Sequence, residues 1–318
     1  LRVAHGAARG RLALVHLNLA ERGSVVRKGI LLFAAKLLGV RVLLHLHAAQ
    51  IFTFYAGLSA PMRFLVRLMF RSADHCVVLG ELWRRWVIET LAVAPGSVTV
   101  VDNGVPAAPE PRAPGIATGP FRLLFLGNLL ERKGLADLLN ALARPEARGV
   151  DFRLTVAGGG AVDRYREMAT SLGLADCVDF TGWVDQTAAR TLLSQSDALV
   201  LPSYDEGLPL VILEAMATGV PVICTPVGAI PEVFVDRRTA LFVQPGDRSG
   251  LAATLVELSR DAELQRSLAA EGLALYRRRF TMEAFTDKIS SLYEQITRPR
   301  ARVDSGRAVE RNGTGVAT

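Results

Sequence analysis

The sequence of 318 residues is poor in the features that build disulfide, zinc and membrane-spanning structures. It has three cysteines, Cys76, Cys177 and Cys224, which lie far apart and form no C-x-x-C pair. This spacing argues against a zinc site and favours buried thiols in a reducing cytoplasm. No run reaches the roughly 18 unbroken apolar residues that a membrane-spanning helix needs. No signal-peptide pattern follows Leu1.

Several catalytic motifs are absent as well. No two Asp residues are separated by a single residue, so there is no D-x-D metal clamp. The sequence has neither a G-x-x-x-x-G-K-[ST] loop nor a G-x-S-x-G elbow, which excludes an ordinary P-loop and an α/β-hydrolase nucleophile. The five histidines are too few and scattered for a zinc cluster. We therefore expect chemistry that needs neither a bound metal nor a cofactor.

Positive charge is concentrated in the first part of the chain. Residues 1–115 contain 14 Lys and Arg against six Asp and Glu, an excess of eight. The whole chain has a net charge of +6, so the remainder has −2. The basic part predicts an anionic partner, which is a phosphorylated substrate, a membrane surface or a nucleic acid.

Apolar strand-like runs alternate with helical patterns almost throughout the chain. Continuous Val, Leu and Ile runs followed by helices are typical of parallel sheets covered on both faces. The predicted strands are 12–18, 41–47, 75–80, 97–104, 121–127, 151–160, 177–182, 197–202 and 220–225. The alternation predicts an α/β protein with two Rossmann-like, doubly wound domains that face a cleft.

A Pro- and Gly-rich stretch separates the two sets of strands and predicts a linker. The tail lacks apolar periodicity and is predicted to be disordered. The expected organisation is a first domain, a linker, a second domain, a C-terminal helix that crosses back to the first domain, and the tail. These parts span residues 1–107, 108–120, 121–280, 281–298 and 299–318.

Basic residues precede a predicted helix in the second half. Gly127 ends a strand, and Arg132 and Lys133 come just before a helix that begins near Leu135. Cations oppose the dipole at a helix N-terminus, but they become favourable there when an anion binds between them and the free N–H groups. The segment is either a solvated surface or a phosphate site.

Two acids flank the first turns of an apolar helix in "YDEGLPLVILEAMATG". Glu206 lies on the loop after a strand, and Glu214 lies about one and a half turns inside the helix. Gly207 permits close approach of a ligand to the backbone, and the amides near Leu208 and Leu210 have no intrahelical partner. Two acceptors so placed can hold hydroxyls at two ends of a polyol. For either acid alone, a solvated carboxylate is the simpler interpretation.

His45 and His47 alternate at the end of the strand "RVLLHLH" and share one face of it. A single strand-end histidine is usually packed and hydrogen-bonded. His47 comes later, closer to the predicted cleft, and is therefore the better site candidate. The "AGGG" at 157–160 is not a dinucleotide fingerprint, and we interpret it as a strand-to-helix turn.

With these pieces in place, the second half resembles the retaining glycosyltransferases of family 4, which have the type B architecture of two Rossmann domains. The resemblance rests on "FLGNLLERKGLADLLNAL", "VAGGG", "VDFTGWV", "SDALVLPSYDEGLPLVILEAMATGVPVI" and "VGAIPEVF", in the family's order and spacing. Glu206 and Glu214 form its E-x7-E signature. "VVDNGV" (100–105) is similar to the family's end of the first domain, and weaker similarity extends back to about Leu12.

The resemblance implies a role for each candidate residue. Glu206 would hold hydroxyls of the donor sugar, Glu214 the ribose and Lys133 the diphosphate, and His47 would lie near the sugar and the leaving phosphate. The remaining donor-binding positions are Gly127, Asn128, Arg132, Val184, Gln186, Gly207, Leu208, Pro209 and Leu210.

The sequence departs from the family's pattern at two places. The family often has Gly-Arg where this chain has Gly127 and Asn128, and the change removes a bidentate phosphate contact. Arg132 is the nearest candidate replacement, although arginines are not interchangeable by position alone. No counterpart of the family's first strand and its Gly-rich loop precedes Leu12. We therefore expect the first domain to be incomplete.

The leading hypothesis is a retaining hexosyltransferase that moves a sugar from a nucleotide-diphosphate sugar to a saccharide or lipid-linked acceptor, in surface polysaccharide or glycolipid synthesis. The alternatives are a nucleotide-sugar epimerase of the same fold and a truncated, non-catalytic nucleotide-sugar-binding homologue. Nucleic acid is not an expected partner. We expect a cytoplasmic protein.

Arg63, Arg67 and Arg71 lie four residues apart on one face of a predicted helix, with apolar residues beside them. This pattern fits peripheral attachment to the anionic inner face of the plasma membrane. It equally fits the solvated face of an ordinary Rossmann helix.

Overall fold

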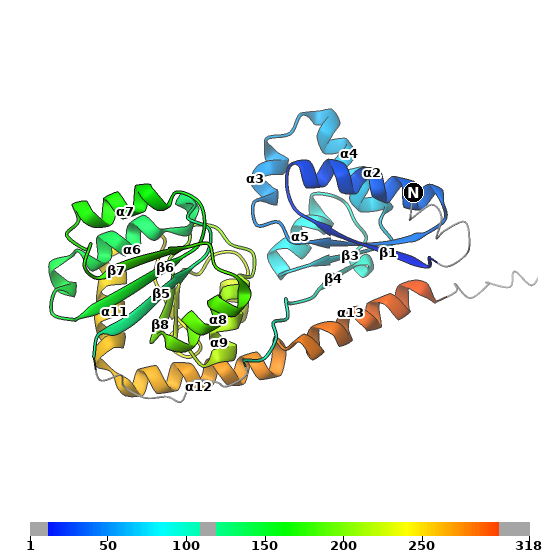
Figure 1. Cartoon of the computed structure of the whole chain (residues 1–318). Helices are drawn as coiled ribbons and strands as arrows, with labels where there is room; N and C mark the ends of the chain where they lie inside the picture. Colours follow the sequence, from blue (N-terminus) through cyan, green and yellow to red (C-terminus); the bar gives the residue numbers. More distant parts are fainter. Residues whose placement is uncertain (1–11, 109–118, 299–318) are drawn as a thin grey trace, which may run out of the picture.

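The computed structural model describes residues 12–108 and 119–298, and these form two parallel-sheet lobes (Figure 1). Most of the predicted linker and the whole predicted tail lie outside the described residues. The prediction of an α/β fold with two parallel sheets is confirmed.

The first lobe contains a four-stranded parallel sheet in the order β1-β2-β3-β4. Its strands are β1 (Leu14–Leu19), β2 (Arg41–Leu46), β3 (His75–Val78) and β4 (Val98–Val100). The connecting helices are α2 (Gly23–Leu37), α3 (Ile51–Ala56), α4 (Ala60–Ser72) and α5 (Glu81–Glu89). Val42, Leu44 and Leu46 alternate along β2 and are buried toward the main core, since successive side chains of a strand point to opposite faces.

The second lobe contains a six-stranded parallel sheet in the order β10-β9-β8-β5-β6-β7. Its strands are β5 (Phe121–Leu126), β6 (Phe152–Ala157), β7 (Val178–Gly182), β8 (Ala198–Leu201), β9 (Val222–Cys224) and β10 (Leu241–Phe242). Its helices are α6 (Leu135–Leu142), α7 (Val162–Ser171), α8 (Gln186–Gln195), α9 (Leu210–Thr218), α10 (Ile230–Val233) and α11 (Arg248–Arg260). The chain order reverses between β8 and β5, and such a switch point is where open α/β sheets bind ligands.

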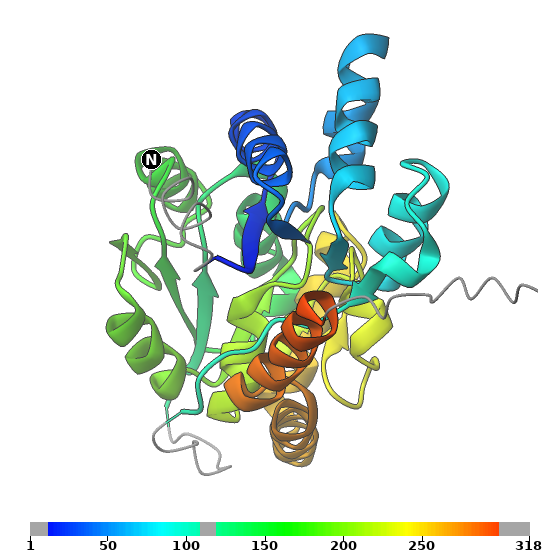
Figure 2. The same ribbon diagram turned by 90° about the vertical axis from the view of Figure 1, so that its right-hand side faces the viewer.

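Two long helices end the described chain. α12 (Ala262–Arg279) packs against α9 in the second lobe, whereas α13 (Met282–Thr297) extends along the first lobe (Figures 1 and 2). Ile289, Leu292 and Ile296 of α13 form a separate apolar cluster with Leu43 and Val77 of the first sheet. The face of that sheet opposite the main core is therefore covered by the C-terminal helix.

The two lobes are also joined by hydrogen bonds. Glu232 of α10 accepts from the backbone N–H groups of Glu81 (2.6 Å) and Leu82 (2.9 Å), at the start of α5. A carboxylate is favourable at a helix N-terminus, where N–H groups lack intrahelical partners. The Asn103 side chain donates to the carbonyl of Leu208, at 3.1 Å. These contacts hold the strand ends of the first lobe beside the loop that contains Glu206.

The three cysteines are free thiols. Burial raises the pKa of Cys76 to about 12, and it also raises the pKa of Cys224. Both thiols lie in strands, as buried small side chains.

Candidate active site

The loop between β8 and α9 carries Glu206 and lies at the switch point of the second sheet. Its path depends on close backbone packing against the loop after β9. Gly228 has φ of 61°, and a Cβ atom there would overlap the carbonyl of Glu206. Only glycine adopts this conformation without a steric penalty. The N–H of Ala229 donates to the carbonyl of Gly207 at 3.1 Å, which fixes the loop further.

The Glu206 carboxylate is buried, at 5% exposure, and is held by several donors. Its Oε1 atom accepts from Lys133 Nζ at 2.5 Å and from the Ser203 hydroxyl at 2.8 Å. An Arg132 guanidinium nitrogen lies 4.0 Å from Oε2. The sequence predicted a site role for both Glu206 and Lys133, and the structure brings them into direct contact. A buried carboxylate with two cations beside it is a pre-positioned group, not the solvated acid of the simpler interpretation.

The segment that carries Arg132 and Lys133 is a single 3-10 turn, Glu131–Lys133, before α6. It is bonded to the Glu206 loop in both directions. The N–H of Tyr204 donates to the carbonyl of Arg132 at 2.7 Å, and Arg132 donates to the carbonyl of Asp205 at 2.8 Å. Gly134 follows with φ of 72°, and a Cβ atom there would overlap the Pro202 carbonyl. The two loops therefore form one backbone unit.

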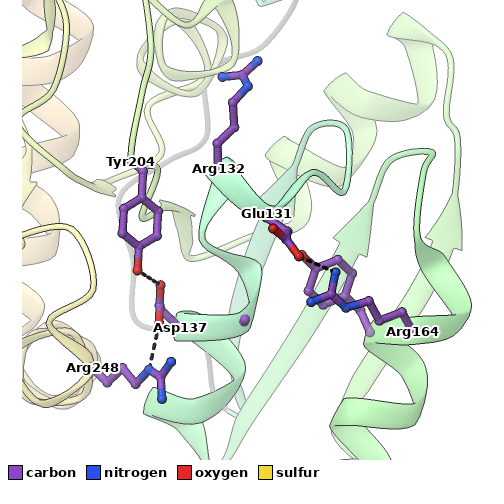
Figure 3. A pocket seen from close by; sticks show the side chains of 8 residues that line it. Glu131, Arg132, Asp137, Arg164, Tyr204 and Arg248 are labelled. Atoms are coloured by element: carbon purple, nitrogen blue, oxygen red, sulfur yellow. Dashed lines mark hydrogen bonds and ion pairs between the residues drawn. The ribbon is translucent and has the colours of Figure 1, made fainter. Parts of the chain in front are cut away.

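A second set of contacts braces this unit from the side (Figure 3). Asp137, in the first turn of α6, accepts from the Tyr204 hydroxyl and from Arg248 Nε, each at 2.7 Å. These side chains line a cavity of about 350 Å³, together with Glu131 and Arg164, which form an exposed ion pair. Sequence reasoning missed this brace because its members are far apart along the chain and carry no common motif.

The ends of β5 and β6 meet beside this unit. The N–H of Gly127 donates to the carbonyl of Ala157 at 2.9 Å, and Leu129 forms a bridge with Gly160. Asn128 is exposed at this edge. The "AGGG" segment is therefore a strand end that packs closely on the loop after β5, in agreement with the interpretation as a turn.

Glu214 lies on α9, and its side chain is half-buried. Burial raises the pKa of this carboxyl, an effect that the nearby Arg190 opposes. α8 packs beside α9 and begins at Gln186, which is exposed, and Val184 precedes it as a half-buried residue. Positions 184 and 186 thus lie on the connection that leads into the helix next to Glu214.

His47 follows β2 in the first lobe. Its N–H donates to the carbonyl of Leu19 at 2.8 Å, and its Nε2 lies 3.3 Å from Asn18 Oδ1. The ring keeps an exposed edge, but partial burial and the nearby His16 lower its pKa. Arg63, Arg67 and Arg71 lie apart from these groups, on the exposed face of α4.

The part of the chain that the structure describes contains no cluster of three or more His, Cys, Asp or Glu side chains suited to a metal ion. None of its helices combines the length and the apolar character that crossing a membrane requires.

Similarity to known proteins was found in both sequence and structure. Residues 108–274 match the family model "Glycosyl transferases group 1", which is more than half of the chain. The chain is 32% identical over 219 residues to a glycogen synthase of Mycobacterium tuberculosis, covering 67% of this chain and 52% of that protein. It is 30% identical over 244 residues to a phosphatidyl-myo-inositol mannosyltransferase of Mycolicibacterium smegmatis, covering 75% and 61%. The chain thus spans about half the length of the curated relatives that it matches.

Solved structures agree on the fold. A sucrose-phosphate synthase from Thermosynechococcus elongatus superposes with a TM-score of 0.76 at 23% identity, covering 92% of this chain and 75% of that one. Anabaena Alr3699/HepE in complex with UDP-glucose superposes with a TM-score of 0.74 at 21% identity, covering 92% and 82%. Both the resemblance and the fold class predicted from the sequence are confirmed. With a family model matched over more than half of its length, this chain belongs to the group 1 glycosyl transferases, family 4, which have the type B architecture of two Rossmann-like domains.

Proposed function

We propose that this protein transfers a hexosyl unit from a nucleotide-diphosphate sugar to a saccharide or lipid-linked acceptor, with retention of configuration and without a metal ion. The observation that carries the proposal is the buried Glu206 carboxylate, bonded to Lys133 at the switch point of the second sheet. A carboxylate fixed on a strand-end loop can accept bonds from sugar hydroxyls, and the ammonium beside it can receive a diphosphate.

Different residues of this site hold the sugar, the diphosphate, the ribose and the base of the donor. Glu206 and the backbone of Gly207, Leu208, Pro209 and Leu210 hold the sugar. Lys133 and Arg132 hold the diphosphate beside Gly127 and Asn128, near the N-terminus of α6, where free N–H groups favour an anion. Glu214 holds the ribose, and Val184 and Gln186 border the base. His47 approaches from the first lobe.

The proposed reaction depends on charge separation. Breaking the sugar–phosphate bond places positive charge on the sugar ring and negative charge on the leaving diphosphate. Fixed cations aimed at the leaving group stabilise that separation without reorganisation. Lys133 serves in this role, since its partner Glu206 lies on the sugar side. The acceptor hydroxyl attacks on the face that the diphosphate leaves, and the leaving phosphate takes its proton.

The test is a comparison of turnover and binding in Glu206→Gln. Donor hydrolysis and transfer are assayed with UDP-glucose, ADP-glucose and GDP-mannose, and binding of the matching nucleoside diphosphate is measured by calorimetry. Loss of a charged hydrogen bond costs ~1.5–3 kcal/mol, which is about a 10- to 150-fold loss of turnover. Affinity for the nucleoside diphosphate is expected to change little.

Asp205→Asn is the matched control, because it removes the same charge one residue earlier, and within residues 12–108 and 119–298 the hydrogen bond to Asp205 is to its carbonyl. Equal losses of turnover and diphosphate affinity in Glu206→Gln would contradict the assignment. Binding of a donor without hydrolysis or transfer by the unmodified protein would instead identify a nucleotide-sugar-binding protein.

The proposal of a lipid-linked acceptor is supported by the outer surface of α2 and α4. Residues 22–73 contain eight Lys and Arg and no Asp or Glu. The exposed apolar side chains on these helices include Val26, Ile30, Phe64, Leu65 and Leu68. A basic surface with exposed apolar side chains fits the anionic headgroups and the acyl boundary of a bilayer, at about 1 kcal/mol per basic residue near the surface. We infer peripheral attachment there, where a lipid-linked acceptor resides.

Vesicle co-sedimentation tests this surface. Arg63 Nε and a terminal guanidinium nitrogen each donate at 2.8 Å to backbone carbonyls at the end of α3, so changing Arg63 would also disturb the fold. The better variant is Arg67→Gln with Arg71→Gln, and Arg277→Gln with Arg278→Gln on α12 is the control of equal charge. Salt-sensitive binding to anionic vesicles is expected to fall only in the first variant. Equal binding to neutral and anionic vesicles would contradict membrane attachment through this basic surface.

A further inference from the structure

A continuous row of rings lies on the face of the first sheet that α13 covers. The Tyr293 hydroxyl of α13 lies 2.6 Å from His16 Nδ1, and His16 Nε2 lies 3.2 Å from His45 Nδ1. The rings of His45 and His47 have centroids 4.0 Å apart, with an angle of 34° between their planes. His47 Nε2 in turn lies 3.3 Å from Asn18 Oδ1. The row therefore connects the C-terminal helix with the end of β2.

Parallel register produces this row from residues that are distant in sequence. Asn18 of β1 lies opposite His45 of β2, and His16 lies opposite Leu43. Alternate residues of a strand share a face, so His16, Asn18, His45 and His47 all project from one side of the sheet. α13 packs on this side and supplies Tyr293.

We assign the tautomers of the row from the donor and acceptor strengths of its groups. A phenol is a good donor and a neutral imidazole nitrogen a good acceptor, so Tyr293 donates to His16 Nδ1. His16 then carries its proton on Nε2 and donates it to His45 Nδ1. The proton of His45 is on Nε2, an atom that is buried and has no partner among the described residues.

Charge is excluded from the middle of the row. His45 is 1% exposed, and burial together with His47 and His16 lowers its pKa to about 2. Among the described residues, the ionisable side chains that adjoin His45 are His16 and His47, and His16 also acts on His47. Tyr293 of α13 contacts His16. Burial lowers the pKa of His16 and raises that of Tyr293, so the row is uncharged at neutral pH.

We propose that Tyr293, His16 and His45 are positioning residues that hold His47 as a neutral imidazole in one orientation at the active site. The inference rests on the transfer function proposed above, which places His47 beside the donor sugar. With Nε2 donating to Asn18, Nδ1 of His47 is left as an acceptor for a hydroxyl. A protonated His47 would lose that acceptor and would repel the positive charge that develops on the sugar ring.

The first test is a pH titration of the histidine ring signals by NMR, with His47 assigned from the signal lost in His47→Asn. In Tyr293→Phe, the loosened row exposes more of the His47 ring to water, and in His16→Leu the charge that His16 would acquire on protonation is also gone. Both variants are expected to raise the pKa of His47 by about 0.5 unit or more, toward its ordinary value of 6.5.

Tyr276→Phe is the matched control. Its hydroxyl donates to the carbonyl of Val105 at 3.1 Å, so the substitution also removes a buried phenol bond, but away from the histidines. An unchanged His47 titration in both row variants, or an equal shift in Tyr276→Phe, would overturn the inference.

The second test is the pH dependence of kcat/KM for donor hydrolysis. In Tyr293→Phe, the pKa of the acid limb of this profile is expected to rise by the same amount as the pKa of His47 measured by NMR. The value of kcat/KM is expected to change less at high pH. A uniform loss at every pH would show a merely structural role and would overturn the proposal. If the unmodified protein has no activity, the proposed function fails, and the NMR titration alone decides whether the row controls His47.

Discussion

The contact between Lys133 and Glu206 makes Lys133→Ala the most informative single substitution. The Lys133 side chain is 14% exposed, and its Nζ atom lies 2.5 Å from Glu206 Oε1. Alanine removes the ammonium but leaves the buried carboxylate. The substitution therefore has two consequences that can be measured separately, a loss of folding stability and a loss of diphosphate affinity.

The expected loss of stability depends on the donors that remain around Glu206 in Lys133→Ala. Removal of one partner of a buried ion pair costs about 3–5 kcal/mol, because the other charge stays buried without compensation. Here Ser203 still donates at 2.8 Å and Arg132 still lies at 4.0 Å, so we expect the low end, about 3 kcal/mol. For the ligand, loss of a charged hydrogen bond weakens binding of a diphosphate by about 10- to 150-fold.

The assay is titration calorimetry with UDP and uridine, the first chosen because structural relatives were solved with UDP. Lys133→Ala is expected to weaken the binding of UDP by that factor and to leave the binding of uridine nearly unchanged. Lys36→Ala is the control, since it breaks another lysine–carboxylate pair, with Asp74 at 2.7 Å, in the first lobe. Equal loss of affinity for UDP and uridine would refute the diphosphate role.

Thermal or denaturant unfolding tests the stability part. Adding Glu206→Gln to Lys133→Ala removes the uncompensated charge, so the double variant is expected to be more stable than Lys133→Ala alone. If it is less stable, the pair does not act as a buried ion pair, and the explanation of both results fails.

Two further predictions concern Glu214 and metal ions. Burial raises the pKa of Glu214 in the folded state above its ordinary value of 4.5, which applies in the unfolded state. The free energy of unfolding therefore falls as pH rises from 4.5 through the raised pKa of the folded state. Glu214→Gln should therefore raise the melting temperature at pH 8 but not below pH ~4. It should also weaken nucleotide binding. A lower melting temperature at pH 8 would contradict the burial argument. Activity should also survive excess EDTA, and full loss that is restored by magnesium or manganese would disprove metal-independent transfer.

Much of this fold was predictable because buried parallel strands leave a simple pattern in the sequence. Continuous apolar runs marked the strands, Gly127 marked the end of one strand, and Gly207 marked the loop after another. Lys133 and Glu206 were each singled out by local chemistry, a cation before a helix and an acid after a strand. Their direct contact was not predictable from either pattern, since it depends on how two loops 73 residues apart pack together.

Other contacts escaped prediction because their partners have no local signal. Tyr293 lies in an ordinary amphipathic helix, and nothing in its neighbours indicates that it meets His16, 277 residues earlier. Glu232 likewise belongs to a short helix, and its role depends on two N–H groups of the other lobe. Such contacts are decided by the docking of lobes and helices, which strand and helix periodicity does not specify.

Several polar groups that cost this fold stability lie in or beside the proposed donor site. An apolar pair in place of Lys133 and Glu206 would be neutral or stabilising in a typical core. Glu214 is half-buried with a raised pKa, and His45 buries a ring nitrogen without a partner among the described residues. Folding alone explains none of these three features, because each would be relieved by an apolar or neutral side chain of similar size. Lys133, Glu206 and Glu214 gain partners when a ligand supplies hydroxyls and phosphate oxygens, and His45 acts through His47. The stability cost is therefore itself an argument that these groups serve a bound molecule.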